Sequence, residues 1–166
     1  MSRLQEAVRI QLLGGFEVSV EDRRLPHSAW RLRKARTLVK LLALQPSHRL
    51  HRDRVVEYLW PDLGVDAARN NLHQVVHAAR RAFSTLGVDG ASVLGLQDDL
   101  VVLGAGSHVV TDVETLRADV ARVGASGDAA ALAGVLGQSP HELLPEDAYE
   151  PWAQPHADVL REWRCT

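Results

Sequence analysis

The chain has 166 residues, of which 46% are hydrophobic and 24% are charged, enough for one or two small domains with a buried core. The net charge of −2 hides a split, because residues 1–110 carry 15 Lys and Arg against 11 Asp and Glu, whereas residues 111–166 carry 4 against 10. A basic front part favours a polyanionic partner. One cysteine excludes an internal disulfide framework, and no apolar run reaches the roughly 18 residues of a membrane span, which favours the cytoplasm.

Strands are predicted at the start of the chain. Apolar and polar residues alternate over residues 8–12 and again over 16–20, and Gly14-Gly15 stands between the two runs. This two-residue period on both sides of a glycine turn is typical of a β-hairpin. Residues 23–25 are expected to add a short third strand that ends at Pro26.

Three helices are predicted next. The apolar period becomes helical over residues 29–44 and again over 52–60, and Pro46 and Pro61 end these two helices. A loop over 62–65 leads to a third helix over 66–84, for which Asp66 is the predicted N-cap. The buried stripe of this third helix consists of Leu72, Val75, Val76, Ala79 and Phe83.

A second hairpin, over 93–96 and 100–103 with a turn at 97–99, is predicted to follow a loop over 87–91. From residue 111 the chain becomes acidic and helical, with helices at 112–123, 128–136 and 152–163 and a loop over 139–149. The predicted fold is therefore an α+β winged helix-turn-helix over 1–110, with an N-terminal antiparallel sheet, three helices and a C-terminal β-hairpin wing. A small all-α segment of the helical-repeat kind follows over 111–166.

The outward face of the helix over 66–84 carries the main functional signal. At 100° per residue, Asn70, Gln74, His77 and Arg81 point away from the buried stripe. Within this helix, no carboxylate follows Asp66. Amide side chains pair with adenine and arginine pairs with guanine, whereas a merely solvated face usually mixes Glu with Lys. The pattern predicts that these four side chains read bases in the major groove of double-stranded DNA. An ordinary polar helix remains the alternative.

Basic residues around the three helices are candidates for contacts with DNA phosphates, which position a protein without reading sequence. Three of them stand where the second helix begins, and the free N–H groups at a helix start favour an anion. The candidates are Arg31, Arg33, Lys34, Arg49, His51, Arg52, Arg69, His73 and Arg80. The alternative is a solvated basic face.

Residues 8–110 resemble the OmpR/PhoB-type winged helix of the Streptomyces antibiotic regulatory protein family. The stretches that carry the resemblance are LLGGFEVSV, LPHSAWRLRKARTLVKLLAL, HRLHRDRVVEYLWPDL and ARNNLHQVVHAARRAF. Residues 111–166 resemble the opening of the bacterial transcriptional activator domain, through VVTDVETL and HELLPEDAYEPWAQPHADVLREW.

The resemblance implies a bacterial transcription activator that binds DNA as paired copies on direct repeats. It implies base contacts from Asn70, Gln74, His77 and Arg81, and phosphate contacts near Arg52. It also implies that the loop with Trp60, Asp62 and Leu63 faces RNA polymerase. Two features depart from the family: the wing turn is the acidic Gln97-Asp98-Asp99, and the activator segment is too short to be complete.

Other classes of function are weaker. His73 and His77 have the i,i+4 spacing of zinc ligands, but Gln74 stands where a zincin has its Glu and no third ligand is near in sequence. No catalytic site, metal or cofactor is therefore expected, and the chain is not expected to be an enzyme. A non-catalytic protein-interaction module, whose basic helices dock an acidic partner, is the alternative function.

Overall fold

A computed structural model describes residues 7–137 and 142–165. The chain forms two compact units: unit 1 contains Met1–Val8 and Val18–Val109, and unit 2 contains Arg9–Glu17 and Val110–Thr166. Unit 2 thus includes a segment from near the start of the chain. Among the described residues, no helix combines the length and the apolar character needed to cross a membrane.

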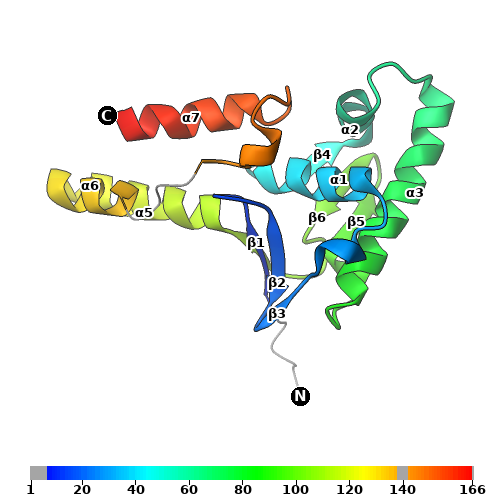
Figure 1. The fold of residues 1–166 in the computed structure, drawn as a ribbon, viewed down its shortest axis with the longest axis horizontal. Helices are drawn as coiled ribbons and strands as arrows, with labels where there is room; N and C mark the ends of the chain where they lie inside the picture. Colours follow the sequence, from blue (N-terminus) through cyan, green and yellow to red (C-terminus); the bar gives the residue numbers. More distant parts are fainter. Residues whose placement is uncertain (1–6, 138–141, 166) are drawn as a thin grey trace. The chain divides into compact units, whose positions relative to one another are not determined.

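Unit 1 mixes strands and helices (Figure 1). In chain order it contains β2 (Glu17–Val20), β3 (Arg23–Arg24), the 3-10 helix η1 (His27–Ala29), α1 (Arg33–Leu44), β4 (Arg49–His51), α2 (Arg52–Leu59), α3 (Val65–Ser84), α4 (Gly90–Val93), β5 (Leu94–Gln97) and β6 (Leu100–Leu103). Strands β1 (Val8–Gln11), β2 and β7 (Val109–Thr111) contain residues of both units, and unit 2 adds α5 (Asp112–Ser126), α6 (Ala129–Gly137), η2 (Pro145–Asp147) and α7 (Gln154–Cys165). The mixed α+β fold predicted from the sequence is confirmed.

Unit 1 contains a three-stranded antiparallel sheet with the order β4-β6-β5, in which β4 lies between α1 and α2 in the chain and β5 and β6 follow α4. Strands β5 and β6 pair from Leu94↔Leu103 to Gln97↔Leu100, as the predicted hairpin requires. Strand β4 pairs with β6 along its whole length and was not predicted. Its three residues, with only Leu50 apolar, are too few to show a two-residue period.

Helix α3 packs its apolar face into the core of unit 1, next to α1, with α2 at its N-terminal end (Figure 1). Leu38 and Leu42 of α1 and Phe83 of α3 are fully buried, and Val76 is 2% exposed. The ring of Trp30 meets Phe83 edge-on at 5.8 Å between centroids. Burial of such side chains stabilises the fold by roughly 1.5–3 kcal/mol each. The apolar face of α3 therefore fixes the helix against the core of unit 1.

Two predicted helix starts in unit 1 are wrong. Helix α1 begins at Arg33 rather than at residue 29, because the 3-10 turn η1 precedes it and Leu32 is extended. Helix α3 is capped by Gly64 rather than by Asp66, since the amide of Ala68 already donates to the Gly64 carbonyl at 2.9 Å. Asp66 instead lies in the first turn, where its carboxylate faces the positive end of the helix dipole.

The loop predicted over 87–91 contains the start of α4. The Asp89 side chain accepts a hydrogen bond from the Ala91 amide at 3.2 Å and caps this short helix. A Cβ placed on Gly90 would collide with the backbone carbonyl of Arg80 in α3. The close approach of the two helices therefore requires glycine at this position.

A carboxylate in unit 2 binds the N-terminal segment of the same unit. The two oxygens of Asp112 accept hydrogen bonds from the amides of Leu12 and Leu13, at 2.8 and 3.0 Å. Burial raises the pKa of Asp112, while these amides act in the opposite direction. Thr111 and Glu114 form a capping box at the start of α5, and the first residue of this helix is Asp112 itself.

The rest of unit 2 follows the predicted helices with shifted ends. Helix α7 begins at Gln154 rather than at Trp152, which is a buried residue just before it. The predicted loop over 139–149 contains the turn η2, and its residues 139–141 lie outside the described part of the chain. The Arg117 guanidinium of α5 stands 5.7 Å from the Trp163 ring centroid, a cation–π contact with α7.

Candidate nucleic-acid interface

The outward face of α3 lies open to solvent. Asn70, Gln74, His77 and Arg81 are all exposed, whereas Leu72 and Phe83 on the other face are at most 5% exposed. The orientation predicted for this helix is confirmed, and its role in reading bases stays a prediction. Because the helix is anchored through its buried face, these four side chains project from a fixed platform.

The polar groups on this face are available to a ligand. Within the described part of the chain, the side chains of Asn70, Gln74, His77 and Arg81 make no hydrogen bond or ion pair to another residue. Amide, imidazole and guanidinium groups together offer both donors and acceptors. Such a set matches the edges of base pairs in the major groove.

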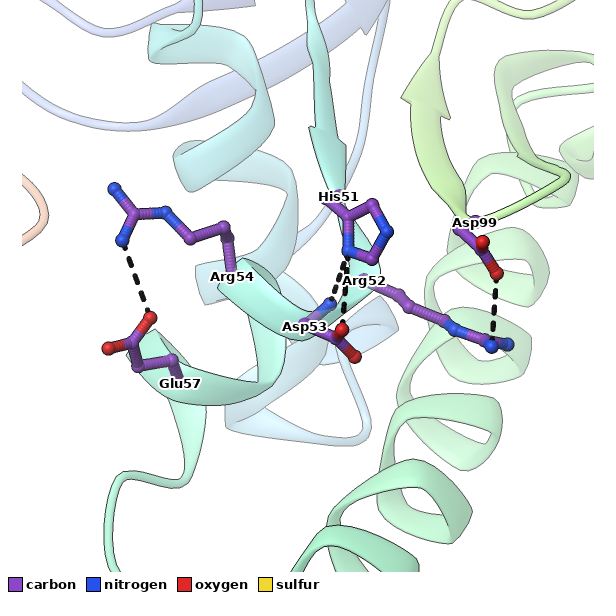
Figure 2. Close-up of polar contacts among 6 residues, drawn as sticks. All are labelled: His51, Arg52, Asp53, Arg54, Glu57 and Asp99. Carbon is purple, nitrogen blue, oxygen red and sulfur yellow. Dashed lines mark hydrogen bonds and ion pairs between the residues drawn. The ribbon is translucent and has the colours of Figure 1, made fainter.

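The residues at the N-terminal end of α2 already have hydrogen-bond and ion-pair partners within the protein (Figure 2). The Nδ1 atom of His51 accepts a hydrogen bond from the Asp53 amide at 3.2 Å and so caps the helix. The Asp53 carboxylate lies 3.6 Å from the same Nδ1 atom. One amide of the predicted phosphate site is therefore already bound.

The acidic turn between β5 and β6 reaches Arg52. The Arg52 guanidinium lies 3.0 Å from a carboxylate oxygen of Asp99, and the Arg52 amide donates to the Asp99 carbonyl at 2.8 Å (Figure 2). Both side chains are about half exposed, so the ion pair adds little stability. It does reduce the positive charge that Arg52 offers to a phosphate.

Two more of the predicted phosphate ligands, Arg80 and Lys34, have partners within the protein. The Arg80 Nε donates to the Leu94 carbonyl at 2.8 Å and fastens α3 to β5. The Lys34 Nζ donates to the Leu59 carbonyl at 2.6 Å, at the end of α2 where the helix dipole favours a cation. The other predicted phosphate ligands that are exposed are Arg31, Arg33, Arg49, His51, Arg69 and His73.

A groove of about 1050 Å³ adjoins α3 and includes residues that the sequence did not single out. Gln74, His77 and Arg81 line it from α3. Arg23 and Arg24 of β3 line it as well, together with the residues around η1 up to Leu32. The Arg23-Arg24 pair is visible in the sequence, but no local pattern places it beside a helix fifty residues further along.

The link between α2 and α3 displays apolar side chains. Leu63 is 41% exposed and Val65 is 62% exposed, whereas Trp60 is half-buried and caps the C-terminal end of α2. Asp62 is exposed as well. The loop thus presents a small mixed surface next to the start of α3, and its contact with RNA polymerase stays a prediction.

No metal-binding cluster is formed by the described residues, in which no three His, Cys, Asp or Glu side chains gather. His73 and His77 are exposed on α3 and face solvent without a third ligand among these residues. This arrangement gives no support to a zinc site on α3.

No family model matches the sequence, and no curated protein matches it as a relative. Among solved structures, the chain is similar to Mycobacterium tuberculosis EmbR, solved in complex with a low-affinity phosphopeptide, with a TM-score of 0.75 and 18% sequence identity. The similarity covers 97% of this chain and 43% of EmbR, so the chain spans less than half of the length of EmbR. At this identity the likeness concerns the fold alone, and the chain shares the fold of the matched part of EmbR.

Proposed function

We propose that this chain binds double-stranded DNA in a sequence-specific way, as the DNA-binding part of a bacterial transcription regulator. The observation that carries the proposal is the exposed face of α3, with Asn70, Gln74, His77 and Arg81 on a helix whose opposite face is buried. The major groove of B-DNA admits one α-helix, and a rigid helix positions its side chains against base edges.

The charge distribution around α3 supports the same proposal. Arg33, Arg49 and Arg69 are exposed cations near the helices of unit 1, and α3 carries no carboxylate beyond its first turn. These cations would contact phosphates and fix the orientation of the protein. The β5–β6 turn is a weaker candidate, because Asp98 and Asp99 would be repelled by the DNA backbone.

The experiment starts from duplexes of random sequence, because the operator is unknown. Rounds of selection with the full chain yield a preferred duplex, and binding to it and to a scrambled duplex is measured by fluorescence anisotropy over a range of salt concentrations. The affinity should fall steeply with salt. Gln74→Ala should reduce the preference for the selected duplex about tenfold to a hundredfold, the usual effect of losing one bidentate base contact.

The matched control is Gln154→Ala, which removes an exposed amide at the start of α7 in unit 2. This variant should bind both duplexes like the wild type. Equal binding of wild type and Gln74→Ala to every duplex would contradict sequence reading by α3. Absence of any DNA binding would instead favour the protein-interaction module that docks an acidic partner.

We further propose that the regulator activates transcription by contacting RNA polymerase through Trp60, Asp62 and Leu63, with two copies bound side by side on DNA. The exposed Leu63 beside the start of α3 supports a protein contact close to the DNA. Leu63→Ser removes the apolar side chain without adding charge, so it should leave DNA affinity unchanged and lower transcription in a purified system. Val159→Ser is the control, because Val159 has the same exposure of 41% on α7; equal loss in both variants would refute the role of the loop.

A further inference from the structure

The groove beside the C-terminal half of α3 lies wholly within unit 1. Its volume is about 1050 Å³, and its two walls come from distant parts of the sequence. His77 and Arg81 of α3 form one wall, and the chain from β3 through η1 to Leu32 forms the other. The base-reading face proposed above therefore continues directly into a concave surface.

The lining of this groove has one sign of charge. Arg23, Arg24, Arg31 and Arg81 all contribute to it, and no Asp or Glu does. Arg31 and Arg81 are exposed, and their guanidinium groups make no hydrogen bond or ion pair to the rest of the described chain. A groove with cationic walls and without carboxylates is complementary to a polyanion.

The apolar part of the lining suits the same occupant. Pro26, Ala29 and Ala78 are small residues without charge, and they lie among the arginines in the groove. A nucleic-acid backbone alternates apolar sugars with charged phosphates. Small apolar residues allow the sugars to approach closely, while guanidinium groups pair with phosphate oxygens.

The spacing of residues along α3 would place the protein's groove beside one edge of the DNA major groove. Arg81 follows Gln74 by seven residues, about 10 Å along the helix axis. The major groove is about 12 Å wide, and its edges are the two phosphate backbones. When the side chains from Asn70 to His77 face base edges, Arg81 therefore lies where the phosphates run.

We propose that this groove holds the phosphate backbone of the DNA strand that borders the major groove read by α3. Arg24 and Arg31 contact the phosphates from the β3–η1 wall, and Arg81 contacts them from α3. The inference rests on the proposed function and deepens it. It moves Arg81 from the base-reading set predicted by the sequence to the phosphate-binding set.

Arg23 has a different place from its neighbour. A Cβ added to Gly87, at the end of α3, would lie 2.6 Å from the Arg23 Nη1 atom. The Arg23 guanidinium therefore lies against the C-terminal end of α3, where the helix dipole favours a cation. Removal of the Arg23 guanidinium would lower the stability of the fold as well as the positive charge of the groove. The test therefore uses Arg24 and Arg31.

The test compares the double variant Arg24→Gln/Arg31→Gln with the control Arg122→Gln/Arg161→Gln. The control removes the same charge from two exposed arginines of unit 2. On the selected and the scrambled duplex alike, the groove variant should bind roughly tenfold more weakly, and the slope of log K against log salt should fall by about 2. The control should stay close to the wild type on both measures.

Two readouts decide the outcome. Phosphate ethylation interference with the wild type should reveal a contiguous set of phosphates that the groove variant no longer needs, and Arg81→Gln should weaken both duplexes equally. The inference is overturned when Gln74→Ala loses sequence preference but the groove variant behaves like its control. It is also overturned when Arg81→Gln changes the preference for the selected duplex over the scrambled one more than it changes the affinity for both duplexes. Failure of the wild type to bind any duplex would overturn the proposed function and this inference together.

Discussion

Helices α3 and α6 differ in how their sequences specify burial. In α3, seven residues that recur at helical spacing are buried, including Leu72, Val76 and Phe83. In α6, which is almost entirely apolar, none of the residues is buried within the described structure. A helix with a polar and an apolar face has only one favourable orientation, whereas a uniformly apolar helix specifies none. Apolar content by itself therefore does not make a helix part of a core.

The difference has a consequence for function. The buried face of α3 fixes the direction in which Gln74 and His77 project, as a surface that reads bases requires. Helix α6 contributes few buried contacts to unit 2. We therefore expect substitutions in α3 to change stability far more than equivalent substitutions in α6.

The largest effect is expected for Phe83→Ala. It removes a fully buried ring and its edge-on contact with Trp30, which should destabilise the fold by about 3–5 kcal/mol. The matched change in α6 is Leu136→Ala, at a half-buried position, and should cost less than about 1.5 kcal/mol. Urea unfolding followed by circular dichroism measures both values, and similar losses in the two variants would contradict the contrast.

Two glycine-to-alanine substitutions should change the stability of the protein in opposite directions. Gly90→Ala places a Cβ against the Arg80 carbonyl, where backbone must move, so it should destabilise by about 1–3 kcal/mol. Gly134→Ala in α6 meets nothing within 4 Å and should stabilise the helix by about 0.5–1 kcal/mol. Melting temperatures that move in the same direction for both variants would show that one of these sites is packed differently.

The smallest effect concerns the pH dependence of unit 2. Burial, and then the positive charge of Arg117, lower the pKa of His156 below its usual value of 6.5. Since the unfolded chain binds the proton more readily, the stability that neutral His156 contributes is present above about pH 6.5 and is lost as the pH falls through its folded pKa. Urea midpoints between pH 7.5 and 5 should therefore fall less in His156→Gln than in the wild type. Identical pH profiles would refute this role.

Sequence periodicity predicted the features that depend on one element at a time. The helical period of α3 gave both its buried stripe and its exposed face, because Leu72 and Gln74 are assigned by the geometry of a single helix. The hairpin of β5 and β6 follows in the same way from two short apolar runs around a polar turn. Helix ends were less well predicted, since α1 begins only after the 3-10 turn η1 and the extended Leu32.

Only the tertiary structure decided which residues from distant segments meet. The pairing of β4 with β6, the bond from Arg80 to Leu94 and the ion pair of Arg52 with Asp99 join positions that no local pattern relates. The groove that brings Arg24 and Arg31 next to Arg81 is the clearest case. A sequence period records which face of an element is apolar, but the neighbours of its polar face are set by how the whole core packs.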